Sequence, residues 1–213
     1  QADGVMSALL TGEEGEITMG NPDFLYFLYK LGMRMMTLTW NYENSLGFPN
    51  VRLDKKSSAS SDRYCLSQNK GLKEQGIVFL EEMERLGMII DVSHLSDAGF
   101  YDVLEHTTKP FVASHSNARS VCPAVRNLTD DMVRRLAERG GITGINFCKE
   151  FLGKPDVSQN YLDQAVVHMK YLMNLGGEDF VALGSDFDGI TRYHDLSDCS
   201  VMPKLVHTMK KPA

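Results

Sequence analysis

Short apolar runs alternate along the chain with longer segments in which apolar residues recur every three or four positions. Runs of this kind are typical of buried parallel strands, and the longer spacing is typical of helices that cover such strands. The pattern therefore predicts an α/β fold with parallel strands and helical crossovers. Six strands are predicted, over residues 5–10, 35–39, 88–93, 111–114, 142–147 and 180–183.

Helices are predicted between most of these strands. Apolar residues fall on one face of residues 71–86, and Thr129 is a good N-cap for a helix whose first turn is acidic. Residues 42–70 are polar and too long for a plain connector, which favours a lid or a binding loop. The tail from Ile190 is weakly patterned. The predicted helices cover residues 21–31, 71–86, 97–105, 129–140 and 158–175.

Composition narrows the function classes. The 213 residues carry a net charge of −6, which argues against a nucleic-acid partner. No apolar run reaches the length of about eighteen residues that a membrane span needs. Four widely spaced cysteines, without a C-x-x-C pair, indicate neither a thiolate zinc site nor a disulfide framework. A reducing compartment is therefore the default, and we expect a cytoplasmic protein.

Candidate chemistry gathers where the predicted strands end. Two apolar runs each finish in Ser-His, at His94 and His115, about one strand–helix–strand unit apart. Acidic residues follow two other strands, at Glu13/Glu14 and at Asp186. Because the carboxyl ends of parallel strands face one way, these side chains can converge. Two imidazoles with a carboxylate are a hydrolytic zinc set, although a single histidine after a strand is more often a polar loop residue.

The order of six short motifs resembles the membrane (renal) dipeptidase family, and the resemblance runs from about residue 8 to residue 190. It implies a (β/α)8 TIM-type barrel of the metal-dependent hydrolase kind that holds two zinc ions. The motifs are Gly12-Glu-Glu-Gly15, Leu38-Thr-Trp-Asn41, Ile90-Asp-Val-Ser-His-Leu-Ser96, Ser114-His-Ser-Asn-Ala118, Arg126-Asn127 and Gly184-Ser-Asp-Phe-Asp-Gly189.

The resemblance also implies roles for single residues. Glu14, which a glycine follows, is similar to the family's metal-bridging carboxylate, and His94 and His115 are similar to the two imidazole ligands of one zinc. Arg126 resembles the residue that pairs with the substrate's terminal carboxylate, as a guanidinium fork can. Asp186 resembles the acid that contacts the substrate amine and passes a proton to the leaving nitrogen. Catalytic roles thus fall to Glu14 and Asp186.

The chain departs from the family pattern in three places. No histidine precedes His94, so the family's His-x-Asp pair, which completes the other zinc site, is absent. Trp40 stands where mammalian members have a histidine, as we expect for a bacterial member; with Arg126 and Asn127 it is assigned to substrate binding. Cys148 falls where the family has a substrate-contacting tyrosine.

The alignment to the family implies a single, incomplete barrel domain over residues 1–213. The chain would begin at the third strand of the barrel and stop before its closing helix, leaving about six βα units. The complete enzyme would hold two zinc ions, and one site lacks its His-x-Asp ligands here. We therefore expect the chain alone to be weakly active or inactive. Family analogy also suggests a homodimer.

The function expected is that of a zinc-dependent dipeptidase, which hydrolyses the peptide bond of dipeptides through metal-activated water. One alternative is a metal-dependent amidohydrolase acting on another small amide or a lactam. A second alternative is a non-catalytic relative that keeps the barrel and binds a small ligand. His168 is expected to lie on a helix flank and not to be a metal ligand.

Overall fold

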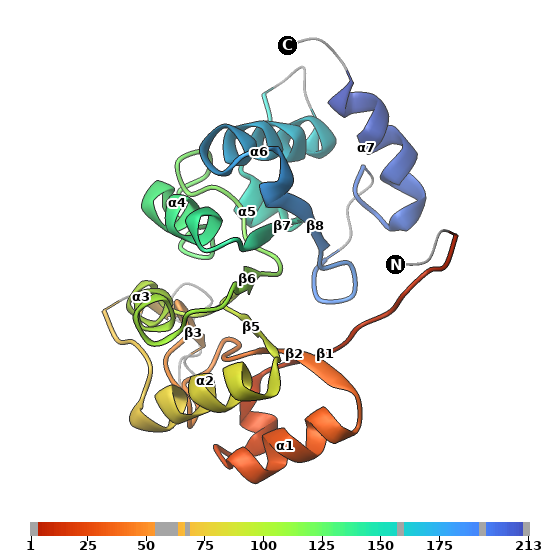
Figure 1. Ribbon diagram of the computed structural model, residues 1–213. Coiled ribbons are helices and arrows are strands. Elements are labelled where there is room, and N and C mark those ends of the chain that lie inside the picture. The colour runs from red at the N-terminus through yellow and green to blue at the C-terminus, as the bar shows by residue number, and fades with distance from the viewer. Residues whose placement is uncertain (1–3, 54–63, 67–68, 157–159, 192–194, 211–213) are drawn as a thin grey trace. The chain divides into compact units, whose positions relative to one another are not determined.

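In the computed structural model the chain divides into two compact units, residues 1–111 and residues 112–213 (Figure 1). The structure describes residues 4–53, 64–66, 69–156, 160–191 and 195–210. Each unit contains three parallel strands that alternate with helices. The predicted α/β class and the six predicted parallel strands are therefore confirmed.

The first unit is built on three parallel strands in the order β1, β2, β5. Two of its helices, α1 and α3, begin directly after a residue whose side chain caps them. The Asn21 side chain accepts a hydrogen bond from Asp23 N at 2.9 Å, and Ser96 caps its helix in the same way. The elements are β1 (Leu10–Glu13), α1 (Pro22–Lys30), β2 (Met33–Thr37), α2 (Glu74–Leu86), β5 (Ile89–Asp91) and α3 (Asp97–His106), with a 3-10 turn at Gly15–Thr18.

The first strand is shifted from its predicted position. Residues 5–9 are not in a strand, and pairing with β2 begins only at Leu10, opposite Met33. The apolar residues before Leu10 remain exposed, so their hydrophobicity alone did not make a strand. As a consequence, Glu13 is the last strand residue and Glu14 the first residue beyond it.

The long polar segment contains an antiparallel pair of strands that the sequence did not reveal. β3 (Val51–Leu53) pairs with β4 (Tyr64–Leu66), and each strand is too short to show an alternating pattern. The predicted lid over residues 42–70 also includes residues 54–63 and 67–68, which lie outside the described residues. The preceding segment, residues 41–50, packs on α2. A Cβ atom at Gly76 would lie 2.1 Å from Leu46 O, so only glycine permits this approach.

The second unit also has three parallel strands, in the order β6, β7, β8. Thr129 caps α4 as predicted, since its hydroxyl accepts a hydrogen bond from Met132 N at 3.2 Å. The last helix was missed because its short pattern buries only Leu205. The elements are β6 (Val112–Ala113), α4 (Asp130–Glu138), β7 (Ile142–Asn146), α5 (Lys149–Leu152), α6 (Tyr161–Gly176), β8 (Val181–Ser185) and α7 (Met202–Met209), with 3-10 turns at Glu178–Phe180 and Cys199–Val201.

None of the helices that the structure describes combines the length and the apolarity needed to cross a membrane.

Candidate metal centre

His94 follows β5 and is held in an unusual backbone conformation. Its φ is 69°, in the left-handed region that non-glycine residues seldom adopt, and its side chain is buried. Its Nδ1 lies 3.0 Å from Oδ1 of Asn41. An amide oxygen can only accept, so Nδ1 carries the ring proton and the lone pair of Nε2 is available to a ligand.

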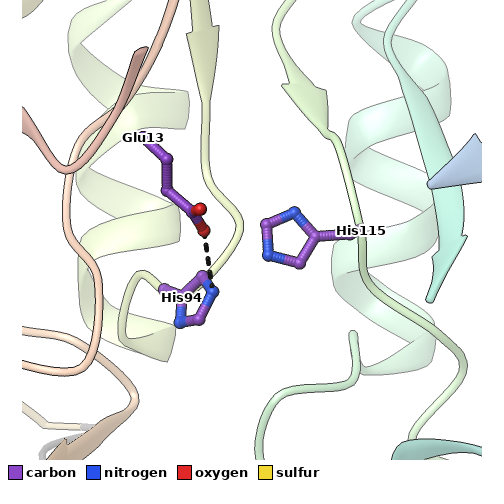
Figure 2. A group of neighbouring side chains, drawn as sticks. All are labelled: Glu13, His94 and His115. Atoms are coloured by element: carbon purple, nitrogen blue, oxygen red, sulfur yellow. Dashed lines mark ion pairs between the residues drawn. The ribbon is translucent and has the colours of Figure 1, made fainter. Parts of the chain in front are cut away.

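The available nitrogen of His94 faces a carboxylate. Figure 2 draws Glu13 and His94 with His115 of the second unit, and its dashed line marks the contact between Glu13 and His94. His94 Nε2 lies 3.3 Å from Glu13 Oε1. Two ligands at about 2.0–2.2 Å on a tetrahedral zinc are separated by roughly 3.3–3.6 Å. The pair therefore fits two adjacent corners of a zinc coordination shell.

Glu14, the carboxylate that the family resemblance singles out, has a different partner. Its Oε1 accepts a hydrogen bond of 2.7 Å from Asn44 Nδ2, and its backbone φ is 82°. The buried Asn44 amide also donates to Leu38 O at 2.8 Å and accepts from the backbone of residues 46 and 47. Asn44 thus fixes Glu14 against the end of β2, while Glu13 faces His94.

Trp40 lies beside His94 in the same unit. The centroids of the Trp40 and His94 rings are 6.3 Å apart, and the centroid of the Tyr42 ring is 5.4 Å from that of the indole. The indole is 36% exposed. An exposed aromatic surface next to a candidate ligand could contact a small substrate.

In the second unit, His115 follows β6 and is also buried. Its Nδ1 lies 2.7 Å from Ser114 Oγ. Its backbone oxygen accepts hydrogen bonds from Arg126 Nη2 at 3.4 Å and from Asn146 Nδ2 at 3.5 Å. The candidate metal ligand and the candidate substrate-binding arginine are therefore neighbours within this unit.

The loop that carries Arg126 is fixed from several sides. The guanidinium lies 5.3 Å from the centroid of the Phe151 ring and is 4% exposed. Asn127 Nδ2 donates to Cys122 O at 2.9 Å and to Phe151 O at 2.8 Å, so its amide nitrogen ties the loop to α5. His168 holds the loop from α6, because its Nδ1 accepts from Ala118 N at 3.1 Å.

His168 itself is a fully buried core residue of α6, although the sequence placed it on a helix flank. Its second ring nitrogen pairs with Leu152 O at 3.0 Å, so both nitrogens have protein partners. Burial lowers the pKa of His168 to about 4, which keeps the ring neutral. The residue serves packing and leaves no nitrogen for a metal.

Asp186 lies directly after β8 with a left-handed φ of 67°. Its Oδ2 accepts a hydrogen bond of 3.0 Å from Asn146 Nδ2, the same amide group that reaches His115 O. A Cβ atom at Gly189 would lie 2.2 Å from Asp186 Oδ1, so glycine makes room for the carboxylate. Sequence reasoning missed Asn146, although a polar residue that ends an apolar strand is the signal that identified His94 and His115.

Cys148, which the family resemblance aligns with a substrate-contacting tyrosine, has a thiol whose pKa is raised. Burial, followed by a hydrogen bond to Glu150, raises the pKa of the Cys148 thiol to about 12. The thiol donates to Glu150 Oε2 at 3.0 Å and stays protonated at neutral pH. The described cysteines Cys122, Cys148 and Cys199 are all free thiols.

Comparison with known families identifies the chain. Residues 1–212 match the family described as membrane dipeptidase, peptidase family M19. The chain belongs to this family. A protein of Klebsiella pneumoniae, described as an uncharacterized protein in the pqqA 5′ region, is 40% identical over 87% of the chain. An uncharacterized dipeptidase of Schizosaccharomyces pombe is 37% identical over 84% of the chain.

A solved member resembles the chain closely in fold. The metallo peptidase from Rhodobacter sphaeroides, liganded with a phosphinate mimic of the dipeptide L-Ala-D-Ala, matches 98% of the chain with a TM-score of 0.84 and 32% identity. Together with the six parallel strands, this likeness confirms the predicted fold class of the family. The chain spans 66% of the Klebsiella protein, 41% of the yeast protein and 58% of the Rhodobacter chain.

Proposed function

We propose that the protein acts as a zinc-dependent dipeptidase that hydrolyses the peptide bond of dipeptides. The observation that carries the proposal is the Glu13–His94 pair, whose separation of 3.3 Å suits two ligands of one zinc ion. Membership of the membrane dipeptidase family supports the reaction class. The dipeptide mimic bound to the Rhodobacter relative supports the substrate class.

The proposed metal ligands are His94, His115 and a carboxylate of the Glu13–Glu14 pair. The family resemblance favours Glu14 as the bridging carboxylate, and the contact with His94 favours Glu13. The complete enzyme would hold two zinc ions. When bound, zinc would supply Lewis-acid polarisation and a lowered pKa for a water molecule.

Residues of the second unit would bind and protonate the substrate. Arg126 would hold the terminal carboxylate through two parallel hydrogen bonds, with Phe151 supporting the guanidinium plane. Asp186 would contact the free amine and give a proton to the departing nitrogen. Asn127 keeps Arg126 in place through the contacts of its amide, and Trp40 would border the substrate from the first unit.

The substrate class is tested by removing the arginine. In the complete enzyme, Arg126→Ala should lower kcat/KM for a dipeptide with a free carboxylate about 100-fold or more, and much less for the same dipeptide as its amide. Arg134→Ala, which removes an exposed arginine of α4, is the matched control and should change neither value.

Two outcomes would contradict the proposal. An equal loss on the dipeptide and on its amide would favour an amidohydrolase for another small amide or a lactam. Purified protein that takes up no zinc by elemental analysis would favour a non-catalytic relative that only binds a ligand.

A further inference from the structure

Residues 41–50 form a segment of the first unit that contacts the backbone at and just after His94. Asn50 N donates to His94 O at 2.7 Å, and Ser96 N donates to Phe48 O at 3.1 Å. A β-bridge also joins Pro49 to Leu95. These contacts hold the backbone of residues 94–96 and so support the left-handed conformation of His94, which needs support from its surroundings.

The contact between Asn41 and the ring bears directly on the metal chemistry of His94. A neutral imidazole has two tautomers, and only the nitrogen without a proton can bind a metal. Asn41 Oδ1 accepts a hydrogen bond from Nδ1, 3.0 Å away, and so keeps the ring proton on Nδ1 and the lone pair on Nε2. The other tautomer would place the proton on Nε2, where it would be donated to Glu13 Oε1 and would block the metal, and it would leave Nδ1 with no proton to donate to Asn41.

We propose that Asn41 is a positioning residue that fixes the tautomer and the ring orientation of His94, so that Nε2 is presented to the metal. This inference rests on the proposed zinc site and adds a determinant of its affinity. Partners of this kind on metal-binding histidines are typically worth about 10–100-fold in metal affinity. The side chain of Asn41 would touch neither metal nor substrate.

The test measures zinc affinity and the tautomer separately. Zinc affinity is taken from competition with a chelator, and the tautomer of His94 from ¹⁵N chemical shifts of the ring in metal-free protein. Asn41→Leu keeps the size of the side chain and removes the acceptor; it should lower zinc affinity about 10–100-fold and mix the tautomers. Asn41→Ala is a smaller replacement in case the leucine variant does not fold.

A conservative variant and a control complete the design. Asn41→Asp keeps an acceptor for Nδ1–H and should retain zinc affinity and the wild-type tautomer. Ser45→Ala lies on the same segment, and the Ser45 hydroxyl makes no hydrogen bond to any residue that the structure describes. This control should match the wild type in both measurements.

The outcomes separate this inference from the proposed function. Wild-type affinity together with a wild-type tautomer in the leucine or alanine variant would overturn the role of Asn41 and leave the zinc site standing. Failure of the aspartate variant to retain affinity would also count against it. A wild-type protein that binds no zinc would instead overturn the proposed site, whatever the tautomer in the metal-free protein.

Discussion

The two units use the same short sequence, an apolar strand followed by Ser-His, but they support the histidine differently. In the first unit Asn41 contacts His94 from 53 residues away, and the backbone oxygen of His94 accepts from a backbone N–H. In the second unit the contact to Nδ1 comes from the adjacent Ser114, and the backbone oxygen of His115 accepts from Arg126 and Asn146 side chains.

The same strand-Ser-His motif is thus held by different kinds of residue in the two units. The side chain that contacts Nδ1 of His94 is Asn41, which is not among the candidate substrate-binding residues. The support of His115 includes the arginine proposed to bind substrate and, through Asn146, the acid proposed to protonate the leaving group. We therefore expect changes in the second unit to affect metal and substrate together.

The largest expected effects come from removing each histidine. His94→Ala and His115→Ala should each lower dipeptidase activity by roughly a thousand-fold or more, since losing a ligand should exceed the 10–100-fold typical of its outer partners. Bound zinc is measured by elemental analysis and activity by release of free amino acids. Full zinc content in either variant would show that the replaced histidine is not a ligand, and the two histidines could then no longer be compared as metal ligands.

The two adjacent carboxylates can be separated by a matched pair of variants. Because Glu13 faces His94 and Glu14 faces Asn44, Glu13→Gln should lower zinc affinity about 100-fold and Glu14→Gln less. The measurement is chelator competition on both purified variants. A larger loss in Glu14→Gln would instead support the carboxylate that the family resemblance assigns.

Coupling within the second unit is tested at Asn146. Asn146→Ala removes a donor to Asp186 and to His115 O, so it should lower kcat about 10–100-fold and weaken zinc binding as well. Asn160→Ala, at the N-cap of α6, is the control and should cost about 1 kcal/mol of stability without changing kcat. Loss of kcat with unchanged zinc affinity would show that His115 does not depend on Asn146.

The smallest effect concerns the stability of the second unit in acid. The pKa of His168 is lowered to about 4 in the folded protein, against an ordinary value of 6.5, so the unfolded chain binds the extra proton first. The neutral, buried His168 therefore contributes fully to the free energy of unfolding above pH 6.5. This contribution falls by up to about 3 kcal/mol as the pH is lowered toward 4.

The pH effect is measured by urea unfolding at pH 7.5 and pH 5, in the wild type and in His168→Gln. The wild type should lose more stability than the variant on acidification. The Asn41 and Asn44 side chains, which contact His94 and Glu14 in the first unit, are amides and do not titrate. At pH 5 the exchange of backbone amide hydrogens should therefore increase first in the second unit. An identical pH dependence in both proteins would contradict this assignment.

The sequence was sufficient for the features that depend on local pattern. His94, His115 and Asp186 were proposed as candidates because each follows an apolar run, and the carboxyl ends of parallel strands share an edge. The choice between Glu13 and Glu14 is harder, since neighbouring strand residues point to opposite faces and one residue of register exchanges them. The first strand began five residues later than expected, so this register could not be read from hydrophobicity.

Residues that act through long-range contacts could not be assigned in advance. The roles of Asn41 and Asn44 depend on how residues 41–50 fold back on strand ends that are distant in sequence. The β3–β4 pair and α7 escaped prediction because each is too short to establish a period. Asn146 is different, because the rule used for the histidines would have found it.

Gly76 in α2 allows the close packing on which the support of His94 depends. A single methyl group at this position would collide with the Leu46 carbonyl, which also accepts a hydrogen bond from Lys73 N at 2.8 Å. The displaced carbonyl belongs to the chain segment that carries Asn41 at one end and Asn50 at the other. A larger side chain on α2 would therefore shift this segment and disturb the His94 imidazole without touching it. The close packing at Gly76 thus limits which substitutions in α2 the site can tolerate.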